Sequence, residues 1–464
     1  MKTFVAYVMS LLLMVAGLVA CGASDPADTE GATATPRPTD EPAPTDEPSP
    51  TASPTANPTP TAAPPTPTST PAPEGDLAYT AAYGGNPAGD WDRDNVEQYQ
   101  MLHPDLEVDR TGVNLYSNPI PTAFYILLES NQQPDVFSSF IGGNLYNYVE
   151  QGAIADISDL WQEMGWDEVF PEPIKEMATV DGRQYFVPMA VQWNPIWYRT
   201  DIFAEHDLAP PETWEGLLQL CDRLDAEGVI PIALSSTGWR PPLARWFTIL
   251  NMRLNGPEFH ERLMRGQEQY DDERVRQVFE HWATMIEHNC FSDEPTNYRT
   301  AADQIYEGEA AMYNLGEWLS ESSNEGLPDT FDFFSFPTLN PDVSRGEIAL
   351  VYGAYMSAEA EHPQEARRFL AYLGSAESQT MNVETLGRVA TNLEVDQSLY
   401  NDVYRRGLEF VQEADHITQL FEFSAAPEVG GQALVAFSNF WQNPDQIDET
   451  LTRLETARAQ HHGE

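Results

Sequence analysis

Apolar and polar residues alternate in short blocks along residues 77–140. The stretch LAYTAAYGG (77–85) predicts a strand that enters a glycine turn, and NVEQYQMLHP (95–104) predicts a helix that ends at its proline. The stretches LEVDRTGV (106–113) and PDVFSSF (134–140) predict two further strands, with the helical pattern IPTAFYILLESNQQ between them. Strands that alternate with helices favour a parallel α/β sheet. Such sheets bind ligands at the carboxyl ends of their strands.

Two later stretches have the three-to-four-residue period of amphipathic helices. In TWEGLLQLCDRLDAEG (213–228), Thr213 is suited to cap the start of a helix and Gly228 to end it. In HPQEARRFLAYLG (362–374), the proline falls in the first turn and Gly374 marks the stop. Both stripes predict core-facing helices. They comprise Trp214, Leu217, Leu218, Cys221 and Leu224 in the first and Ala366, Phe369, Leu370 and Leu373 in the second.

The N-terminus has a different pattern. Lys2 precedes an almost unbroken apolar run from Phe4 to Ala20. The run is short for a membrane-spanning helix, which needs ~20 residues, and it suits the core of a secretory signal. Because the run ends at Cys21, residues 1–20 resemble a bacterial lipoprotein signal that is cut before a cysteine that takes a lipid. An ordinary secretory signal with an incidental cysteine and an uncleaved membrane anchor are the alternatives.

The segment that follows is rich in Thr, Pro, Ala, Asp and Glu and has almost no apolar residue except Ala. Such a composition cannot bury enough surface to offset its ordering entropy. We therefore expect residues 21–76 to form a lipidated, disordered stalk. The stalk would hold the rest of the chain away from the extracytoplasmic face of the plasma membrane, in the cell envelope.

The chain beyond the stalk is ample for a hydrophobic core and too long for one simple core, which predicts two lobes. The whole chain has 73 Asp and Glu against 24 Lys and Arg, a formal charge of −49. Phosphate backbones need a basic face, so we expect no nucleic-acid partner. The acidic residues are scattered, which favours a solvated surface suited to salty surroundings over capture of cations.

Cys221 and Cys290 are the only cysteines after Cys21. They are too few for a disulfide scaffold or a zinc site. A disulfide between them and two separately buried thiols both fit, and the sequence does not decide between the two. The chain also has no nucleophile-turn, zinc-peptidase, phosphate-loop or calcium-loop motif. We therefore expect no enzyme activity, no metal and no cofactor.

The ordered set of segments resembles the extracellular solute-binding proteins (family 1 type) of carbohydrate ABC transporters. QQPDVFSSF (132–140) resembles the early Pro-Asp-Val loop of that family, and residues 182–224 resemble its crossover into the second lobe. YEGEAAMYNLGEW (306–318) resembles its Gly-x-Ala-Ala-Met stretch with a following Gly-x-Trp. YGAYMSAEAEHPQEARRFLAYLGSAESQ (352–379) resembles its return to the first lobe. The similarity spans nearly all of residues 77–464.

This resemblance implies an α/β, two-lobed fold of the periplasmic-binding-protein type, with a hinge and a ligand cleft between the lobes. It implies one lobe of residues 77–192 and 345–392 and another of residues 193–344 and 393–464. It also implies a monomer that captures a sugar or oligosaccharide and delivers it to the permease subunits of an ABC importer.

Two alternatives remain open. The chain could bind another kind of solute, such as a peptide, polyamine or metal. It could also be a cell-surface glycoside hydrolase, although acids are so common here that a pair at glycosidase spacing can occur by chance.

The candidate ligand-binding residues follow from the chemistry of a sugar, which has apolar C–H faces and a rim of hydroxyls. Aromatic side chains in predicted loops offer flat contact surfaces, and short polar residues at strand ends offer hydrogen bonds. A carboxylate such as Glu317 accepts hydroxyl hydrogens strongly. The candidates are Asn86, Ser138, Ser139, Trp193, Asn194, Trp239, Arg240, Glu317, Trp318, Tyr352 and Tyr355.

Overall fold

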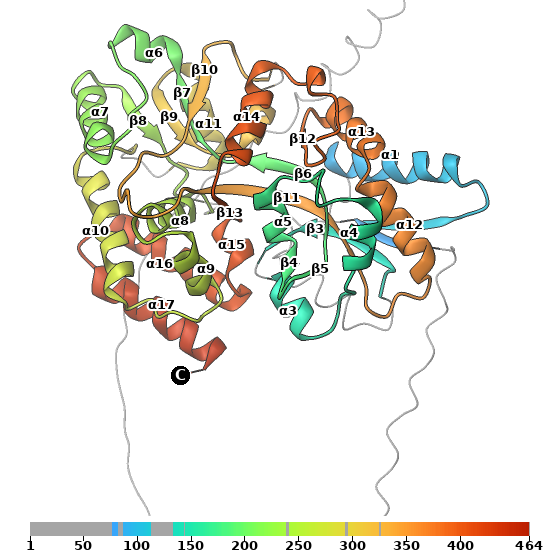
Figure 1. The fold of residues 1–464 in the computed structure, drawn as a ribbon. Helices are drawn as coiled ribbons and strands as arrows, with labels where there is room; N and C mark the ends of the chain where they lie inside the picture. The colour runs from blue at the N-terminus through green and yellow to red at the C-terminus, as the bar shows by residue number, and fades with distance from the viewer. Residues whose placement is uncertain are drawn as a thin grey trace, which may run out of the picture. The chain divides into compact units, whose positions relative to one another are not determined.

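The computed structural model describes residues 77–81, 87–112, 133–142, 144–237, 241–292, 296–323 and 326–463, which belong to one compact unit (Figure 1). The predicted signal, Cys21 and the whole predicted stalk lie outside these ranges, as do Asn86, Trp239 and Arg240. What we infer for those residues therefore stays a prediction. Among the helices that the structure describes, none is long and apolar enough to cross a membrane.

The larger of two main sheets contains, within the described ranges, seven strands in the order β12-β6-β11-β3-β1-β2, with β13 paired to β11. Their bounds are β1 Leu77–Ala81, β2 Val108–Gly112, β3 Val136–Phe140, β6 Val187–Trp193, β11 Gly346–Met356, β12 Val389–Ala390 and β13 His416–Thr418. β6 and β11 are buried along their whole length. The sheet therefore has covered faces, as expected for a sheet with helices packed around it.

Strand direction in this sheet is mixed. β1 is parallel to β2 and β3, as the alternation of strands and helices predicted. β11 is antiparallel to both β3 and β6, with Tyr352 opposite Phe140 and Ala349 opposite Trp193. The prediction of a parallel sheet is thus confirmed for β1, β2 and β3 and was wrong for β11 and for β12, which is antiparallel to β6. Because β11 lies between them, β3 and β6 run in the same direction, and their carboxyl ends reach the same edge as that of β1.

Helices α1 (Pro87–Leu102), α12 (Pro363–Leu373) and α13 (Ala376–Leu386) pack on one another beside the larger sheet (Figure 1). The predicted apolar stripe of α12 is confirmed, since all four of its residues are buried. The Phe369 ring centroid lies 5.1 Å from that of Tyr79 on β1. Smaller elements between β3 and β6 are α3 Asn144–Glu150, α4 Ser158–Met164, α5 Glu172–Met177, β4 Thr179–Val180 and β5 Arg183–Gln184.

The smaller sheet has the order β10-β7-β9-β8 and comprises β7 Ile196–Arg199, β8 Ile230–Ala233, β9 Ala310–Asn314 and β10 Phe331–Phe334. β8 and β9 are parallel, whereas β7 is antiparallel to β9 and to β10. The remaining helices are α6 Thr200–Glu205, α7 Trp214–Ala226, α8 Pro241–Asn255, α9 Pro257–Met264, α10 Glu273–Glu287, α11 Tyr298–Glu307, α14 Asp402–Gln412, α15 Phe421–Ser424, α16 Pro427–Gln442 and α17 Ile447–His462, with the 3₁₀ turns η1 Glu317–Ser322 and η2 Gln397–Leu399.

Helix α7 confirms the predicted cap, because the Thr213 hydroxyl accepts a hydrogen bond from the Gly216 amide at 3.2 Å. Its predicted stripe is rotated slightly in the structure. Leu217, Cys221 and Leu224 are buried as expected, together with Leu220, whereas Trp214 and Leu218 are half-buried.

Cys221 of α7 and Cys290, which follows α10, form a disulfide with Cα atoms 4.9 Å apart. This settles, for the structure, the choice that the sequence left open. The bond ties α7 to the end of α10, 69 residues further along the chain.

The two sheets are joined directly where β6 passes into β7, because only Asn194 and Pro195 separate them. Trp193, the last residue of β6, is fully buried beside the rings of Trp197 and Phe333. A Cβ atom at Gly407 would lie 2.5 Å from the Trp193 ring, so α14 can approach this close only with glycine there.

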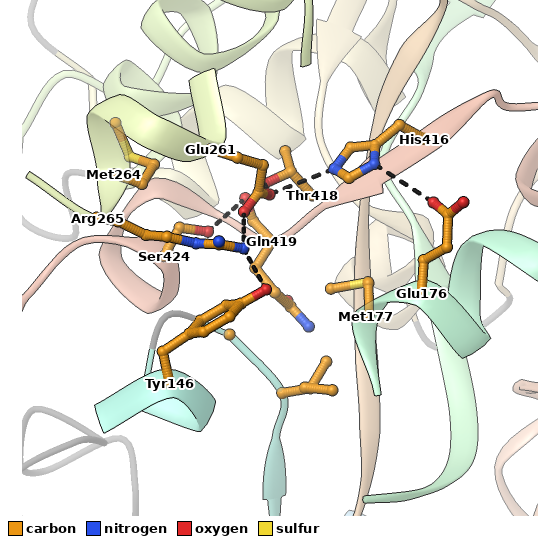
Figure 2. A pocket seen from close by; sticks show the side chains of 12 residues that line it. Tyr146, Glu176, Met177, Glu261, Met264, Arg265, His416, Thr418, Gln419 and Ser424 are labelled. Carbon is orange, nitrogen blue, oxygen red and sulfur yellow. Dashed lines mark hydrogen bonds and ion pairs between the residues drawn. The ribbon is translucent and has the colours of Figure 1, made fainter. Parts of the chain in front are cut away.

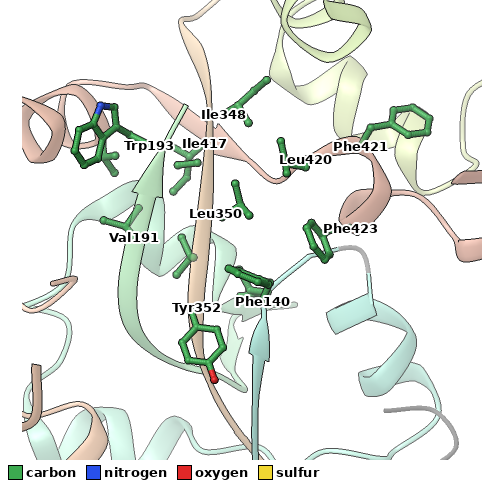
Figure 3. Packing of buried hydrophobic residues seen from close by; sticks show 14 of the residues in the cluster. Phe140, Val191, Trp193, Ile348, Leu350, Tyr352, Ile417, Leu420, Phe421 and Phe423 are labelled. Atoms are coloured by element: carbon green, nitrogen blue, oxygen red, sulfur yellow. The ribbon is translucent and has the colours of Figure 1, made fainter. Parts of the chain in front are cut away.

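A second group of apolar side chains lies between the larger sheet and α15 (Figure 3). Phe140 at the end of β3 contacts Phe423 of α15, with ring centroids 5.2 Å apart. Leu350 of β11 and Leu420 are buried nearby (Figure 3). Residues distant in sequence thus pack the end of β3 and the middle of β11 against α15 here.

Candidate functional site

A polar contact joins the neighbouring edges of the two sheets. Asn194 follows β6, and Asn314 is the last residue of β9. The Asn194 amide Nδ2 donates to the Asn314 Oδ1 at 2.7 Å, and both side chains are buried. The pairing of β7 with β9 places Ile196 opposite Asn314, which explains why the two amides meet. Asn194, a predicted site residue, therefore lies where the sheets approach each other.

Arg245 of α8 completes this contact. Its Nε donates to the Asn194 Oδ1 at 2.9 Å, and the side chain is 1 % exposed. Burial lowers the pKa of Arg245, and the Glu422 carboxylate of α15 partly opposes that change. A buried guanidinium with planar polar neighbours is a rigid donor for hydrogen bonding. Arg245 was not among the residues predicted from the sequence.

Trp318 of η1 lies against this guanidinium, with Arg245 Cζ 5.3 Å from the centroid of the indole. The indole is half-buried and folds back over its own backbone. A Cβ atom at Gly316 would lie 1.8 Å from the Trp318 ring, so glycine is required at that position. We call Asn194, Arg245, Asn314, Glu317 and Trp318 the η1 cluster.

Glu317 extends the η1 cluster toward β6. Its side chain is 2 % exposed, and its Oε1 accepts a hydrogen bond from the Gln192 amide at 2.9 Å. Its Oε2 has no hydrogen-bond partner among the described residues. Burial raises the pKa of Glu317 to about 7, and the charge of Arg388 partly opposes this. Arg388 in turn pairs with Glu321, Nη2 to Oε1, at 3.1 Å.

Ser138 and Tyr352, both predicted site residues, belong to a separate polar network in the larger sheet. Their hydroxyl oxygens are 2.5 Å apart. The Tyr352 hydroxyl also donates to Asp92 Oδ2 at 2.9 Å, and the Tyr79 hydroxyl donates to Asp92 Oδ1 at 2.6 Å. Burial raises the pKa of Asp92 to about 6, although both hydrogen bonds oppose it. Asp92 on α1 was not among the predicted residues.

The other predicted residues lie apart from the η1 cluster or outside the described ranges. Tyr355 is fully buried and stacks on Phe137, with ring centroids 5.0 Å apart. Ser139 is buried within β3, and Trp193 packs among aromatic rings as described above. Whether these residues contact a ligand stays a prediction, as it does for Asn86, Trp239 and Arg240.

A cavity of about 70 Å³ lies between α3, α5, α9 and β13 (Figure 2). Arg265 donates to the Tyr146 hydroxyl, and its Cζ lies 3.5 Å from the centroid of the Tyr146 ring. Glu261 Oε1 accepts from Thr418 at 3.1 Å and lies 3.4 Å from His416 Nε2. We call Tyr146, Glu176, Glu261, Arg265 and His416 the α3–α9 clasp. No motif in the sequence indicated it.

Charges in the clasp support one another. Burial works against ionisation, but the hydrogen bond and charge of Glu261, together with Glu176, raise the pKa of His416. His416 Nδ1 lies 3.7 Å from Glu176 Oε2. Burial acts to raise the pKa of Glu261. The hydrogen bond and charge of His416 outweigh burial, so that the pKa of Glu261 is lowered. When His416 is protonated, its ion pairs with Glu261 and Glu176 therefore link β13 to α9 and α5.

Comparison with known proteins places these features in context. The family model described as bacterial extracellular solute-binding protein matches residues 56–380. An uncharacterized ABC transporter extracellular-binding protein of Pyrococcus horikoshii is 25% identical over 371 residues, covering 78% of this chain and 83% of the relative. A probable sugar-binding periplasmic protein of Mesorhizobium japonicum is 20% identical over 344 residues, covering 72% of this chain and 81% of the relative.

Solved structures share the fold. The bacterial solute receptor AcbH, described as having an exclusive preference for β-D-galactopyranose, matches with a TM-score of 0.75 and 20% identity; the match covers 84% of this chain and 98% of AcbH. A chitin oligosaccharide binding protein matches with a TM-score of 0.69 and 20% identity over 83% of this chain and 98% of its own. The predicted two-lobed α/β fold of the periplasmic-binding-protein type is confirmed.

Proposed function

Because the chain belongs to the bacterial extracellular solute-binding protein family, we propose that it is the substrate-binding component of an ABC importer and captures a sugar or oligosaccharide. The sugar binds between the two lobes and is delivered to the permease subunits of the importer. The protein returns the sugar unchanged, as expected of a receptor rather than an enzyme.

The η1 cluster carries this proposal. Its indole, Trp318, is half-buried and lies beside a buried arginine, two asparagine amides and a carboxylate. An aromatic face suits the C–H face of a sugar ring, and the planar amides and the carboxylate suit its hydroxyls. Asn194 lies in the link between the two sheets, and Glu317 contacts Gln192 of β6 in the larger sheet, so a ligand bound at the cluster lies beside both proposed lobes. Closure about a hinge then encloses the ligand.

The names of similar proteins support a sugar over another solute. Relatives are described as sugar-binding periplasmic proteins, and structural neighbours as receptors for galactopyranose and chitin oligosaccharides. One relative from Synechocystis, 21% identical over 357 residues, is described as binding osmoprotective compounds. A small compatible solute is therefore the second candidate class.

We also propose where the protein acts. Residues 1–20 direct export, Cys21 takes a lipid, and residues 22–76 form a stalk that holds a monomeric two-lobed receptor at the extracytoplasmic face of the membrane. The lobes comprise residues 77–192 with 345–392 and residues 193–344 with 393–464. The strong negative charge of the chain suits a solvated surface in the cell envelope.

A thermal-shift screen of the purified full-length protein tests the function. Monosaccharides, oligosaccharides and osmoprotectants are compared, because a ligand at 100 times its dissociation constant stabilises by ~2.7 kcal/mol. We expect at least one sugar to raise the melting temperature and to be recovered intact by chromatography. A shift with osmoprotectants alone would favour the second class, and hydrolysed sugar would contradict the receptor proposal.

A further inference from the structure

The cationic side chains at the η1 cluster already have anionic or aromatic partners. Arg245 donates to Asn194 at 2.9 Å, faces the Trp318 ring at 5.3 Å and is attracted by Glu422. The guanidinium charge is thus partly compensated within the protein. A charge that is compensated within the protein attracts an anion more weakly than an isolated one.

Arg388 has the same kind of surroundings. Its Nη2 lies 3.1 Å from Glu321 Oε1, and its positive charge also acts to lower the pKa of the Glu317 carboxyl. Arg388 therefore interacts electrostatically with two acidic side chains of η1. Binding of an anionic ligand to Arg388 would have to displace one of these pairings.

Two carboxyl groups at the cluster have an oxygen that is buried and accepts no hydrogen bond from the described residues, namely Oε2 of Glu317 and Oε2 of Glu422. Glu317 is 98 % buried, since 2 % of it is exposed. A buried acceptor without a donor is costly, so a bound donor is favourable there. Sugar hydroxyls and an ammonium group are donors, whereas a carboxylate is not.

These observations lead to a statement about the class of sugar, which rests on the proposed function. We propose that the η1 cluster selects neutral or amino sugars and rejects sugars that bear an acidic group. Among the described residues, Glu321 pairs with Arg388, and the carboxyl groups of Glu317 and Glu422 interact electrostatically with Arg388 and Arg245, so three acidic side chains accompany two basic ones. At pH 8, above the raised pKa of Glu317 (about 7) and of Glu422 (about 6), a ligand carboxylate would meet like charges, and such contacts are unfavourable.

The inference is tested on matched sugars by calorimetric titration of the full-length protein at pH 8, where the Glu317 and Glu422 carboxyls are ionised. The probes are D-galactose and D-glucose, each with its uronate and its 2-amino derivative. Any oligosaccharide that binds in the screen is paired with its derivative oxidised at the primary hydroxyls. We expect each acidic member to bind at least ~tenfold more weakly than its neutral parent, and each amino member to bind at least as tightly.

A charge-removing variant provides a direct comparison. Glu422→Gln keeps the shape of the side chain but leaves the charge of Arg245 uncompensated, so the affinity for the acidic member should rise ~tenfold relative to the neutral one. Glu321→Gln, at a largely exposed position, should act similarly through Arg388. Glu280→Gln on the exposed face of α10 is the control and should leave the ratio unchanged. Apo melting curves verify folding.

The outcomes separate the two proposals. An acidic sugar that binds the parent protein as tightly as its neutral counterpart overturns the charge inference and leaves sugar binding intact. The charge inference is also overturned if neither Glu422→Gln nor Glu321→Gln changes the ratio of the affinities for the acidic and the neutral sugar. The absence of binding by every sugar in the screen contradicts the proposed function itself, and the charge inference falls with it.

Discussion

The guanidinium carbon of Arg245 lies 5.3 Å from the centroid of the Trp318 indole, although the two residues are on different elements, α8 and η1. The same guanidinium holds Asn194, the residue at which β6 leaves the larger sheet. One side chain therefore connects a helix, a 3₁₀ turn and the link between the sheets. Substitutions here therefore test the proposed ligand site more directly than substitutions in the apolar core.

Replacement of Trp318 by alanine tests the aromatic surface of the η1 cluster. The loss of an aromatic contact of ~0.5–1.5 kcal/mol plus its buried area should weaken sugar binding at least ~tenfold. The apo melting temperature should change little, because the indole is half-buried. Calorimetric titration with the best ligand of the screen and apo melting curves measure both.

Trp282→Ala is the matched control for this variant. Trp282 is fully buried in α10, and truncation of a core tryptophan costs ~3–5 kcal/mol. It should lower the melting temperature and leave the affinity of the folded protein unchanged. If Trp318→Ala instead destabilises the apo protein and binds normally, Trp318 belongs to the core.

Glu317→Gln should make the protein more stable at alkaline pH. Burial raises the pKa of Glu317 from an ordinary value of 4.5 to about 7. The folded protein favours the neutral Glu317 carboxyl more than the unfolded chain does. The stability that this carboxyl contributes is therefore fully present below pH 4.5 and is lost as the pH rises through about 7. Glutamine stays neutral at every pH. The free energy of unfolding of the variant should therefore exceed that of the parent by about 3 kcal/mol at pH 8 and by much less at pH 5.

Urea unfolding of both proteins at pH 5 and pH 8 measures this difference. Glu280→Gln, exposed on α10, should show no comparable change with pH. An equal stability difference at the two pH values would mean that Glu317 is not held in a desolvated site.

The α3–α9 clasp should be strongest between pH 4.5 and 6.5. The raised pKa of His416 gives stability that is present below its ordinary value of 6.5 and is lost as the pH rises through the folded value. The lowered pKa of Glu261 gives stability that is present above 4.5 and is lost as the pH falls. Burial lowers the pKa of the adjacent His260 to about 4, so His260 stays neutral over most of this range.

His416→Gln removes the titrating partner of the clasp. Its free energy of unfolding should fall below that of the parent at pH 5.5 and approach it at pH 8. Unfolding titrations at the two pH values check this, with His281→Gln on α10 as a control away from the clasp. If the free energy of unfolding of the variant is lower than that of the parent by the same amount at both pH values, His416 has a packing role only.

Removal of the disulfide should destabilise the folded chain. The bond closes a loop of 69 residues, for which the chain-entropy model gives about 4 kcal/mol. The double variant Cys221→Ser/Cys290→Ser should melt at a lower temperature than the parent, and mass spectrometry with a thiol reagent should find no free thiol at Cys221 or Cys290 of the parent. Labelling of both cysteines in the folded parent would contradict the pairing.

Cys21→Ser tests the proposed anchor. Without the thiol that takes the lipid, the protein should be released into the medium or remain as an uncut precursor. Cell fractionation and lipid labelling measure this, and sugar affinity of the purified variant should equal that of the parent. A variant that stays membrane-bound and lipid-labelled would rule out the lipoprotein interpretation.

Local signals in the sequence predicted helices well. Thr213 starts α7 and Pro363 lies in the first turn of α12, because capping and proline geometry act within one turn of a helix. The antiparallel position of β11 was not predictable in this way. It depends on pairing with β3 and β6, which are more than 150 residues away in the chain.

The site was predicted in part. Asn194, Glu317 and Trp318 were expected and lie in one cluster, whereas Arg245 was missed because it lies next to the core residue Trp246 on a helix. Trp193 was difficult for a different reason. β6 is buried on both faces, so no alternation of apolar and polar residues indicates which way a side chain points.

The position of β11 has a consequence for the order in which the chain folds after export. The strands of the smaller sheet all lie between residues 196 and 334. The larger sheet needs Gly346–Met356 to join β3 to β6. When the chain emerges from the membrane N-terminus first, all strands of the smaller sheet have therefore emerged before β11 can complete the larger sheet. Until then the early strands β1, β2 and β3 present an unpaired edge, which is the stage most exposed to misassembly.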